Sequence, residues 1–532
     1  MNALAVLYGG SLRKAAFEKV LAAESGEAVC ALTMALKKAS SFPDVTKTVI
    51  LVGADFERLA GASGFAAAQG AKGAEIRVLP ELNVKTLLRT LAELSRPFEL
   101  LYFAWADAPF LDRDLAARVA ERHRRYAAEY SYADGWPYGL APEVAAPSAV
   151  GILAALAEGD GGPVNRDALF QVIQKDINAF DIETEISPVD LRSHRVSLTA
   201  DSRRNLLLLT RFQAAGAAGA AGIEQGIAGK PELLRTLPAF YAVQVSGPCP
   251  QACAMCPYPR FTGPGGEAVQ ARRDFMDPAR FEGLLDRIIA FSGDAVIDLS
   301  LWGELALHPQ KTELIRMVLA RRESLCLIIE TSGIGWKRGE LEALADLVRE
   351  DRPFRPWTAP PGPLSWIVSL DAAGKERYGE VRGPGFEEAV GTAAALVSLF
   401  PQDAYVQAVR HTGAEDDVET FYRSWKDRGA RVIIQKYDDF CGFLPQKQAA
   451  DLSPVRRHPC WHLMRDMNIL IDGRVSLCRE DLSVLQGSGR RSVFDEPLEE
   501  IWEQGEERYR EHCAGRYKEI CGECDEYYTF NF

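Results

Sequence analysis

Residues 246–260 read Ser-Gly-Pro-Cys-Pro-Gln-Ala-Cys-Ala-Met-Cys-Pro-Tyr-Pro-Arg, and this stretch decides the fold around it. Its cysteines, Cys249, Cys253 and Cys256, have C-x3-C-x2-C spacing. The β-branched and aromatic run 239–245 predicts a strand before them, and the prolines keep the loop itself out of regular structure. Cysteine thiolates hold iron–sulfur clusters, and three of them would leave one iron of a [4Fe–4S] cluster open to a small molecule.

This loop resembles the cysteine motif of the radical SAM superfamily. The resemblance implies that S-adenosylmethionine (SAM) binds at the open iron and is cleaved reductively to a 5′-deoxyadenosyl radical, which abstracts hydrogen from an unreactive carbon. It also implies an electron donor such as flavodoxin or ferredoxin. The alternatives are a zinc site and three buried thiols, although zinc usually takes four ligands in C-x2-C pairs.

The composition is that of a globular chain with room for about three domains. The net charge is −13, from 61 basic and 74 acidic residues, and the absence of a long basic run argues against nucleic acid as the main partner. No apolar run reaches the roughly 20 residues that span a bilayer, so no membrane is predicted. Eleven cysteines behind an N-terminus without a basic leader predict metal ligation in a reducing compartment, the cytoplasm.

The first 212 residues alternate strands with helices, which predicts an α/β domain with a largely parallel sheet. The expected strands are 3–8, 48–52, 75–79 and 100–104, with a helix at 15–23. The small, glycine-rich segment 213–236 that follows is predicted to be a linker.

This first domain resembles the nucleotidyltransferase branch of the glycosyltransferase-A fold. The resemblance implies a site for Mg²⁺ and a nucleotide such as CTP, formed by Gly9, Gly10, Ser11, Arg13, Asp107 and Asp201. A degenerate or purely binding domain is the alternative, because a fold does not guarantee its chemistry.

Residues 237–450 repeat a strand-then-helix pattern six times, which predicts a partial (βα)6 barrel. The expected strands are 239–245, 296–301, 325–331, 365–370, 404–410 and 431–436. Functional residues are expected at the carboxyl ends of such strands.

Four residues at these strand ends are implied by the superfamily resemblance to bind the cofactor: Gly303, Glu304, Ser369 and Asp371. Gly303 and Glu304 are similar to part of a Gly-Gly-Glu motif that holds the amino group of SAM, with Trp302 in place of the first glycine. Ser369 and Asp371 match a Ser-x-Asp motif near the ribose and carboxylate. The bidentate fork of arginine suits a carboxylate, so Arg382 or Arg410 is expected to clamp SAM or the substrate. Alternatively, Glu304 is a solvated loop residue and Asp371 a helix cap.

Residues 451–532 begin with a hairpin outline around the turn signal Asp472-Gly473. The hairpin brings Cys460 and Cys478 together, and Cys521 and Cys524 add a C-x2-C pair. This arrangement resembles the SPASM/Twitch extension of radical SAM enzymes and implies an auxiliary [4Fe–4S] cluster on these four cysteines. Structural zinc is the alternative. Cys441 and Cys513 are left over, and a second auxiliary cluster to which they add ligands stays open as an alternative to one cluster.

The order of domains resembles the spiro-SPASM family over nearly the whole chain. It implies a radical SAM enzyme that modifies either a peptide or a sugar or aminocyclitol. Two alternatives stay open: a zinc-binding adaptor with a degenerate nucleotidyltransferase domain, and a bifunctional cytidylyltransferase and radical SAM enzyme.

Overall fold

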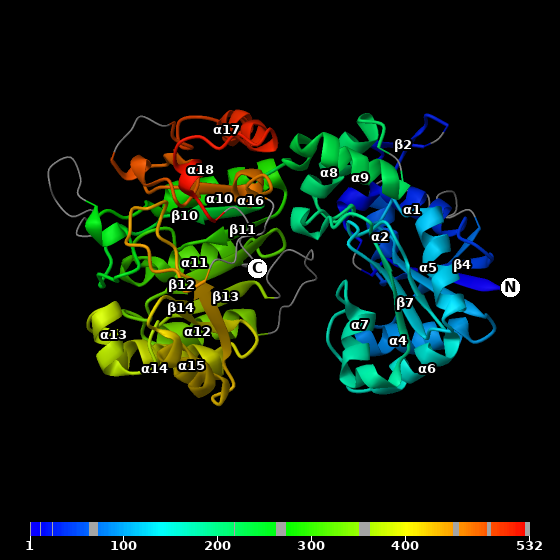
Figure 1. The fold of residues 1–532 in the computed structure, drawn as a ribbon, viewed down its shortest axis with the longest axis horizontal. Coiled ribbons are helices and arrows are strands. Elements are labelled where there is room, and N and C mark those ends of the chain that lie inside the picture. The colour runs from blue at the N-terminus through cyan, green and yellow to red at the C-terminus, as the bar shows by residue number, and fades with distance from the viewer. Residues whose placement is uncertain are drawn as a thin grey trace. The chain divides into compact units, whose positions relative to one another are not determined.

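The computed structural model describes residues 2–10, 12–23, 25–62, 73–217, 219–261, 273–349, 362–450, 457–486 and 491–526. These residues form two units, Met1–Thr236 and Leu237–Phe532 (Figure 1).

The first unit is built on a seven-stranded sheet of order β5-β4-β1-β6-β8-β7-β9. The strands β5, β4, β1 and β6 are parallel neighbours, and β8 runs antiparallel to both β6 and β7. The four predicted strands are therefore confirmed, within a mixed rather than uniform sheet. Its strands are β1 (Ala3–Tyr8), β4 (Val45–Val52), β5 (Ala74–Val78), β6 (Leu100–Trp105), β7 (Tyr130–Asp134), β8 (Glu143–Ala145) and β9 (Ile182–Ile186).

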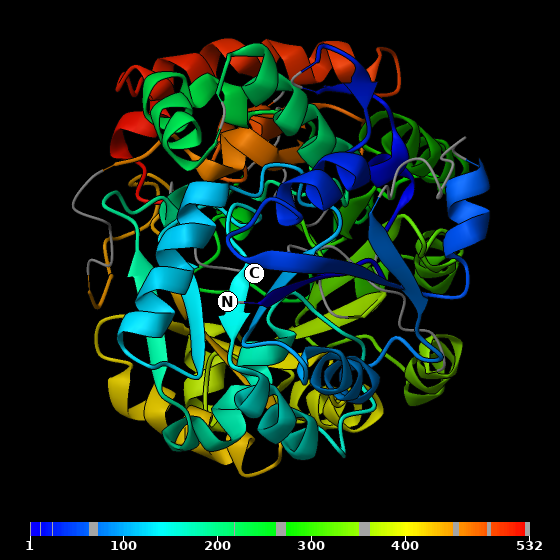
Figure 2. The same ribbon diagram turned by 90° about the vertical axis from the view of Figure 1, so that its right-hand side faces the viewer.

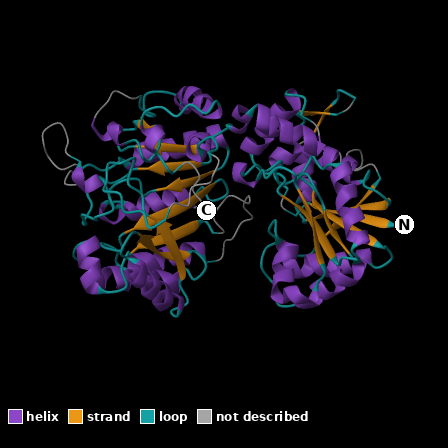
Figure 3. Ribbon diagram, viewed as in Figure 1, coloured by secondary structure: helices purple, strands orange, loops and turns teal. Residues whose placement is uncertain are grey.

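Helices surround this sheet (Figures 2 and 3). The side chains of Asn83, Asp112 and Ser202 accept hydrogen bonds at the N-termini of α4, α5 and α8, which fixes where these helices begin. The helices are α1 (Ala31–Ala39), α2 (Phe56–Ala62), α4 (Val84–Ser95), α5 (Arg113–Arg125), α6 (Pro147–Leu156), α7 (Ala168–Ile173), α8 (Arg203–Ala214) and α9 (Gly219–Gly229).

Two segments of this unit differ from expectation. The helix predicted at 15–23 is wrong, because the chain forms a 3-10 turn at Lys14–Phe17 and then enters a small hairpin of β2 (Leu21–Ala22) and β3 (Ala28–Val29). The segment 213–236, predicted as a linker, contains the end of α8, all of α9 and a 3-10 turn at Pro231–Leu234. Alanine has the highest helix propensity, which explains why this small-residue stretch folds as helix.

Among the described residues, no one helix has both the length and the hydropathy to cross a membrane. The helices α8 and α9 meet both criteria only when taken together, across a bend of 96°.

The second unit is built on an eight-stranded sheet of order β15-β14-β13-β12-β11-β10-β16-β17. Six parallel strands follow one another in sequence order, as predicted, and the sheet stays open because β10 borders β16 and not β15. The strands are β10 (Phe240–Val243), β11 (Ala295–Asp298), β12 (Leu325–Thr331), β13 (Leu364–Ser369), β14 (Ala404–Arg410), β15 (Arg431–Lys436), β16 (Asp466–Ile469) and β17 (Val475–Ser476).

The helices of this unit bury one apolar face against the sheet. Large side chains such as Trp366, Phe281 and Tyr378 are fully buried in one continuous core. The helices are α10 (Pro278–Ser292), α11 (Lys311–Leu319), α12 (Arg338–Val348), α13 (Lys375–Val381), α14 (Phe386–Leu399), α15 (Glu415–Lys426), α16 (Trp461–Arg465), α17 (Leu498–Cys513) and α18 (Ile520–Glu523).

The hairpin predicted around Asp472-Gly473 is present and has a second role. Its strands β16 and β17 are antiparallel, with Asn468 opposite Ser476. In addition β16 pairs in parallel with β10, with Met467 opposite Tyr241. The C-terminal segment is thus joined to the strand that precedes the three-cysteine loop.

A partly buried carboxyl in β8 makes the stability of the first unit depend on pH. Burial is the main cause that raises the pKa of Glu143 to about 7, although Tyr130 donates a 2.6 Å hydrogen bond to it. A raised native pKa means that the folded state binds more protons than the unfolded state between the two values. Stability should therefore fall from about pH 4.5 upward, and the loss should be complete above about pH 7.

We expect Glu143→Gln to remove this loss, because an amide stays neutral and can still accept from Tyr130. At about pH 8 the variant should gain about 1–3 kcal/mol over the wild type, with little gain at about pH 5. Urea denaturation at both pH values measures the difference, with the exposed Glu121→Gln as control. An equal gain at both values would contradict the assignment.

Candidate functional site

The three-cysteine loop follows β10 and is held by backbone and side-chain hydrogen bonds. Gly247 N donates to Asp274 O at 2.9 Å, and Ala254 N donates to Val381 O at 2.8 Å. The hydroxyl of Tyr258, a buried residue of the loop, donates to Gly247 O at 2.9 Å. These contacts fix a loop that lacks regular structure of its own.

Burial and the charge of Arg382 act on all three thiols of the loop. Burial raises the pKa of Cys249 and of Cys256 to about 12, and it raises the pKa of Cys253 as well. The charges of Cys253 and Cys249 raise the pKa of Cys256 further, whereas Arg382 lowers the pKa of all three. A metal that binds here must therefore displace three protons, with Arg382 as the nearby positive charge.

Arg382 is a buried residue fixed by three elements. Its guanidinium forms an ion pair with Asp371, after β13, and its Nε donates to Gln251 Oε1 of the cysteine loop at 3.0 Å. Gln251 in turn donates to the hydroxyl of Tyr378, in α13, at 2.7 Å. Asp371 has a φ of 58° and accepts from Val409 N at 2.8 Å. Two of the predicted cofactor residues, Asp371 and Arg382, thus lie together beside the loop.

Gly303 and Glu304 contact the same loop through their backbone. A Cβ on Gly303 would lie 1.9 Å from Ser246 O, and the residue has a φ of 78°, so glycine is required there. Glu304 N donates to Pro248 O at 2.9 Å. The buried Glu304 carboxylate accepts from Thr331 Oγ1 at 2.7 Å and from Ser332 N at 2.8 Å. Glu304 therefore connects two strand ends and is not a solvated residue.

Ser369 lies in a further carboxylate network at the strand ends. Its hydroxyl and the amide of Gln407 both donate to Glu330 Oε1, at 2.7 and 2.8 Å. Nearby, burial raises the pKa of Asp298 to about 7, with Glu330 raising it further and Arg479 lowering it. Sequence reasoning missed Asp298, which lies inside the predicted strand 296–301 but ends β11 in the structure. It also missed the role of Glu330, the next-to-last residue of the predicted strand 325–331.

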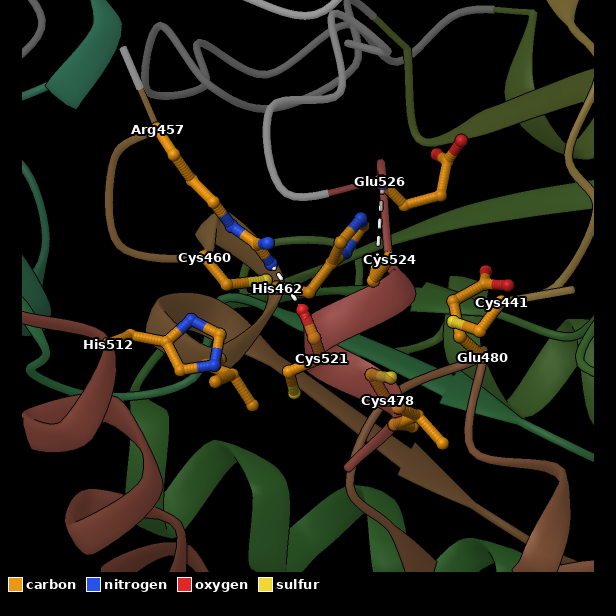
Figure 4. Close-up of a pocket in the computed structure, with 12 residues that line it drawn as sticks. Cys441, Arg457, Cys460, His462, Cys478, Glu480, His512, Cys521, Cys524 and Glu526 are labelled. Atoms are coloured by element: carbon orange, nitrogen blue, oxygen red, sulfur yellow. Dashed lines mark hydrogen bonds between the residues drawn. The ribbon is translucent and has the colours of Figure 1, made fainter. Parts of the chain in front are cut away.

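The second cysteine site is a pocket in which five cysteines take part (Figure 4). Cys441, which follows β15, lines the pocket together with the four predicted cysteines. Cys513 does not line the pocket but packs against the small cluster of Cys460, Leu463 and Tyr509. The lining residues are Cys441, Arg457, Cys460, His462, Leu463, Cys478, Glu480, His512, Ile520, Cys521, Cys524 and Glu526.

The chemistry of this pocket suits a thiophilic metal group. Burial raises the pKa of Cys460 to about 12 and the pKa of Cys478 well above its ordinary value. Among the described residues, neither ring nitrogen of the buried His512 has a hydrogen-bond partner. An unpaired buried ring is costly unless the pocket is filled. The donor set, five thiols with a neutral imidazole beside them, is one that soft metals and iron–sulfur clusters prefer.

In the first unit, the structure brings together the two predicted acidic residues, Asp107 and Asp201, each at most 2% exposed. Arg166 lies with them and donates to both Asp107 oxygens, at 2.8 and 2.5 Å, and to Asp201 at 3.2 Å. Nothing in the sequence pattern had singled out Arg166.

The predicted glycine turn of this unit is partly described. Gly9 N donates to Leu51 O at 2.7 Å, and a Cβ on Gly10 would lie 2.4 Å from the hydroxyl of Tyr8. The side chain of Tyr8 therefore lies directly over the turn. Arg13 is partly buried, and Ser11 lies outside the described residues.

No family model matches the chain. Solved structures show weak likeness to parts of it, at TM-scores below 0.5, and these likenesses assign no reaction to the chain. SuiB of Streptococcus suis bound to its precursor peptide SuiA has a TM-score of 0.40 at 14% identity and covers 53% of this chain and 68% of its own. BtrN in complex with AdoMet and 2-DOIA has a TM-score of 0.36 at 17% identity and covers 55% of this chain and 92% of its own. A cytidylyltransferase from Leptospira borgpetersenii has a TM-score of 0.33 at 13% identity and covers 44% of this chain and 95% of its own.

Two sequence relatives come from Treponema pallidum (strain Nichols), and both are uncharacterized proteins. One is 41% identical over 76 residues, which cover 14% of this chain and 35% of that protein. The other is 36% identical over 371 residues, which cover 68% of this chain and 98% of that protein. The chain therefore belongs to the same family as this second Treponema pallidum protein.

Proposed function

We propose that this chain is a radical SAM enzyme with two iron–sulfur clusters. The observation that supports it most is the distribution of the eleven cysteines. Five line the C-terminal pocket, and Cys30, Cys326 and Cys513 lie outside both sites. Three thiols remain on the loop after β10, and three ligands leave one iron of a [4Fe–4S] cluster available to SAM.

The residues around the loop are suited to hold such a cluster. When bound, it supplies the electron that cleaves SAM and so generates the 5′-deoxyadenosyl radical. Arg382 is a fixed positive charge beside the thiolates and lowers the cost of burying them. Gly303 and Glu304 keep the loop against the ends of β11 and β12, where parallel barrels place their chemistry.

The cofactor residues divide into two kinds in this proposal. Arg382 can share its fork between Asp371 and the carboxylate of SAM, since a guanidinium has five donors. The Glu304 oxygens already accept from Thr331 and Ser332, so its part is to position the backbone of Gly303. Ser369 and Gln407 orient Glu330 toward the same strand ends.

The C-terminal pocket would hold an auxiliary [4Fe–4S] cluster on Cys460, Cys478, Cys521 and Cys524. This cluster would anchor the substrate or accept the electron left after hydrogen abstraction. The substrate class that we propose is a peptide or a sugar or aminocyclitol, and the electron donor is a flavodoxin or ferredoxin. The competing hypothesis is a zinc-binding adaptor in which both sites are structural.

Anaerobic reconstitution separates these hypotheses. The wild type should bind about eight irons per chain, in two clusters, with a broad sulfur-to-iron absorption band. With SAM and a reductant it should form 5′-deoxyadenosine. Cys256→Ala should keep about four irons, in the auxiliary cluster, and form no 5′-deoxyadenosine. Zinc in both sites after oxygen-free purification would contradict the proposal.

The close approach at Gly303 provides a test that does not depend on turnover. Gly303→Ala forces a Cβ into the carbonyl of Ser246 at a left-handed backbone position, so the loop must shift. We expect a loss of about 2 kcal/mol or more in stability and the loss of the cluster on the three-cysteine loop. The control is Gly283→Ala on α10, where a Cβ meets nothing within 4 Å. Full iron content in Gly303→Ala would show that the contact is dispensable.

A further inference from the structure

The buried charges of the first unit form a closed triad. Asp107 lies two residues beyond β6, and Asp201 lies just before α8, so the sheet and a helix end bring the two carboxylates together. Arg166 binds Asp107 through both terminal nitrogens and Asp201 through one of them. The three side chains are at most 2% exposed.

The surroundings leave Arg166 charged and fixed. Its guanidinium lies 4.2 Å from the ring centre of Trp105 and 5.6 Å from that of Tyr138. Burial alone would lower the pKa of Arg166, but Asp107 and Asp201 raise it above the ordinary value. The second oxygen of Asp201 accepts from Asn205 Nδ2 at 2.8 Å. Both carboxylates thus have partners within the protein.

A divalent ion between two such carboxylates would need the same space. Mg²⁺ requires oxygen ligands about 2.0–2.1 Å away in near-octahedral geometry and keeps several waters. The planar fork of an arginine satisfies a carboxylate in its place and brings its own positive charge. The site can hold the guanidinium or the ion, but not both.

We propose that Arg166 takes the place of a divalent metal between Asp107 and Asp201, so that the first unit binds no Mg²⁺ there and performs no metal-dependent nucleotidyl transfer. The bifunctional cytidylyltransferase hypothesis requires a metal at these two residues, and the proposal is incompatible with it. The inference does not depend on the iron–sulfur chemistry of the second unit.

Binding of Mn²⁺, measured by electron paramagnetic resonance on the whole 532-residue chain, tests whether a divalent ion binds between Asp107 and Asp201. Titration with Mn²⁺ should give the same number of bound ions for the wild type, Asp107→Asn and Asp201→Asn. One additional ion in the wild type that either substitution removes would overturn the proposal.

The converse experiment removes the arginine. Arg166→Ala leaves two buried carboxylates without their cation, so MgCl2 should raise its Tm by about 3 °C or more and leave the wild-type Tm unchanged. The double variant Arg166→Ala/Asp201→Asn should lose most of this gain. The control is Arg192→Ala, an exposed arginine paired with Asp134 and Asp190. If Arg166→Ala folds and magnesium leaves its Tm unchanged, the proposal that Arg166 replaces a metal is overturned. If that variant does not fold, the manganese comparison decides alone.

A separate observation concerns Cys441 in the C-terminal pocket. Phe440, Cys441 and Gly442 have φ values of 53°, 55° and 80°, three successive left-handed residues. The turn is fixed because Asp438 accepts from Phe440 N at 2.8 Å and Asp439 accepts from Gly442 N at 3.1 Å. Conformations of this kind persist only when the surrounding structure imposes them. Here they direct Cys441 into the pocket.

The segment that carries Cys524 is held by residues on both sides of this turn. Lys436 pairs with Asp525 at 2.9 Å and also with Glu526, and Gln448 donates to Asp525 at 2.7 Å. On the same side, carboxylate oxygens of Asp438, Asp525 and Glu526 lie within 4.8 Å of one another. Cys441 and Cys524 therefore enter the pocket from adjoining segments.

We infer that Cys441 and Cys524 are interchangeable ligands of one iron in the auxiliary cluster. The inference rests on the proposed function. A cubane cluster takes four protein ligands and the pocket offers five thiols. Cys460, Cys478 and Cys521 are then required, while either member of the pair can complete the set.

Iron counting in a Cys249→Ala/Cys253→Ala/Cys256→Ala background isolates the auxiliary cluster. This background should bind about four irons, and so should its Cys441→Ala, Cys524→Ala and Cys513→Ala derivatives. Cys460→Ala should lose the cluster, and so should the Cys441→Ala/Cys524→Ala pair. Loss of the cluster in Cys524→Ala alone, or its retention in the Cys441→Ala/Cys524→Ala variant, overturns the inference. A background that binds no iron overturns the auxiliary cluster itself.

Discussion

The contact between Gly303 and the carbonyl of Ser246 is the constraint on which the second unit depends. It brings the end of β11 against a loop that has no regular structure, at a distance that only glycine permits. Non-glycine residues with positive φ follow three strands of this sheet, at Trp302, at Asp371, and at Phe440 and Cys441. Backbone strain of this kind accumulates at functional sites. In this sheet it occurs on the segments that pack around the cysteines.

Charge compensation follows from this geometry. Arg382 lies beside the three-cysteine loop, and Arg479 lies next to Cys478 while it also faces the carboxylates of Glu480, Asp438 and Glu330. Arg382 thus links the three-cysteine loop to the carboxylate of Asp371, whereas the partners of Arg479 are carboxylates. Because buried thiolates and carboxylates both need a positive partner, Arg382 serves both groups.

The sequence predicts the parts of the fold that depend on local patterns. Six strands of the second unit and four of the first come from apolar, β-branched or aromatic runs of the right length, and Asp472-Gly473 correctly predicts the hairpin. Pairings between distant segments leave no such pattern. The parallel pairing of β16 with β10, the arrival of Cys441 in the pocket and the position of Arg166 each depend on residues more than 15 apart in sequence. The helix at Gly219–Gly229 was missed because its glycines resemble those of a linker.

Arg166 and Arg382 show how similar buried pairs can differ in function. Both arginines pair with a buried aspartate after a strand, and both have a raised pKa despite burial. Arg166 donates to two buried aspartates and has no thiol among those partners. Arg382 faces Asp371 and three thiols, and burial keeps those thiols protonated until a metal displaces the protons. In the proposed function a metal on those thiols would add negative charge beside Arg382, so Arg382 would take part in the metal site whereas Arg166 would have a structural role.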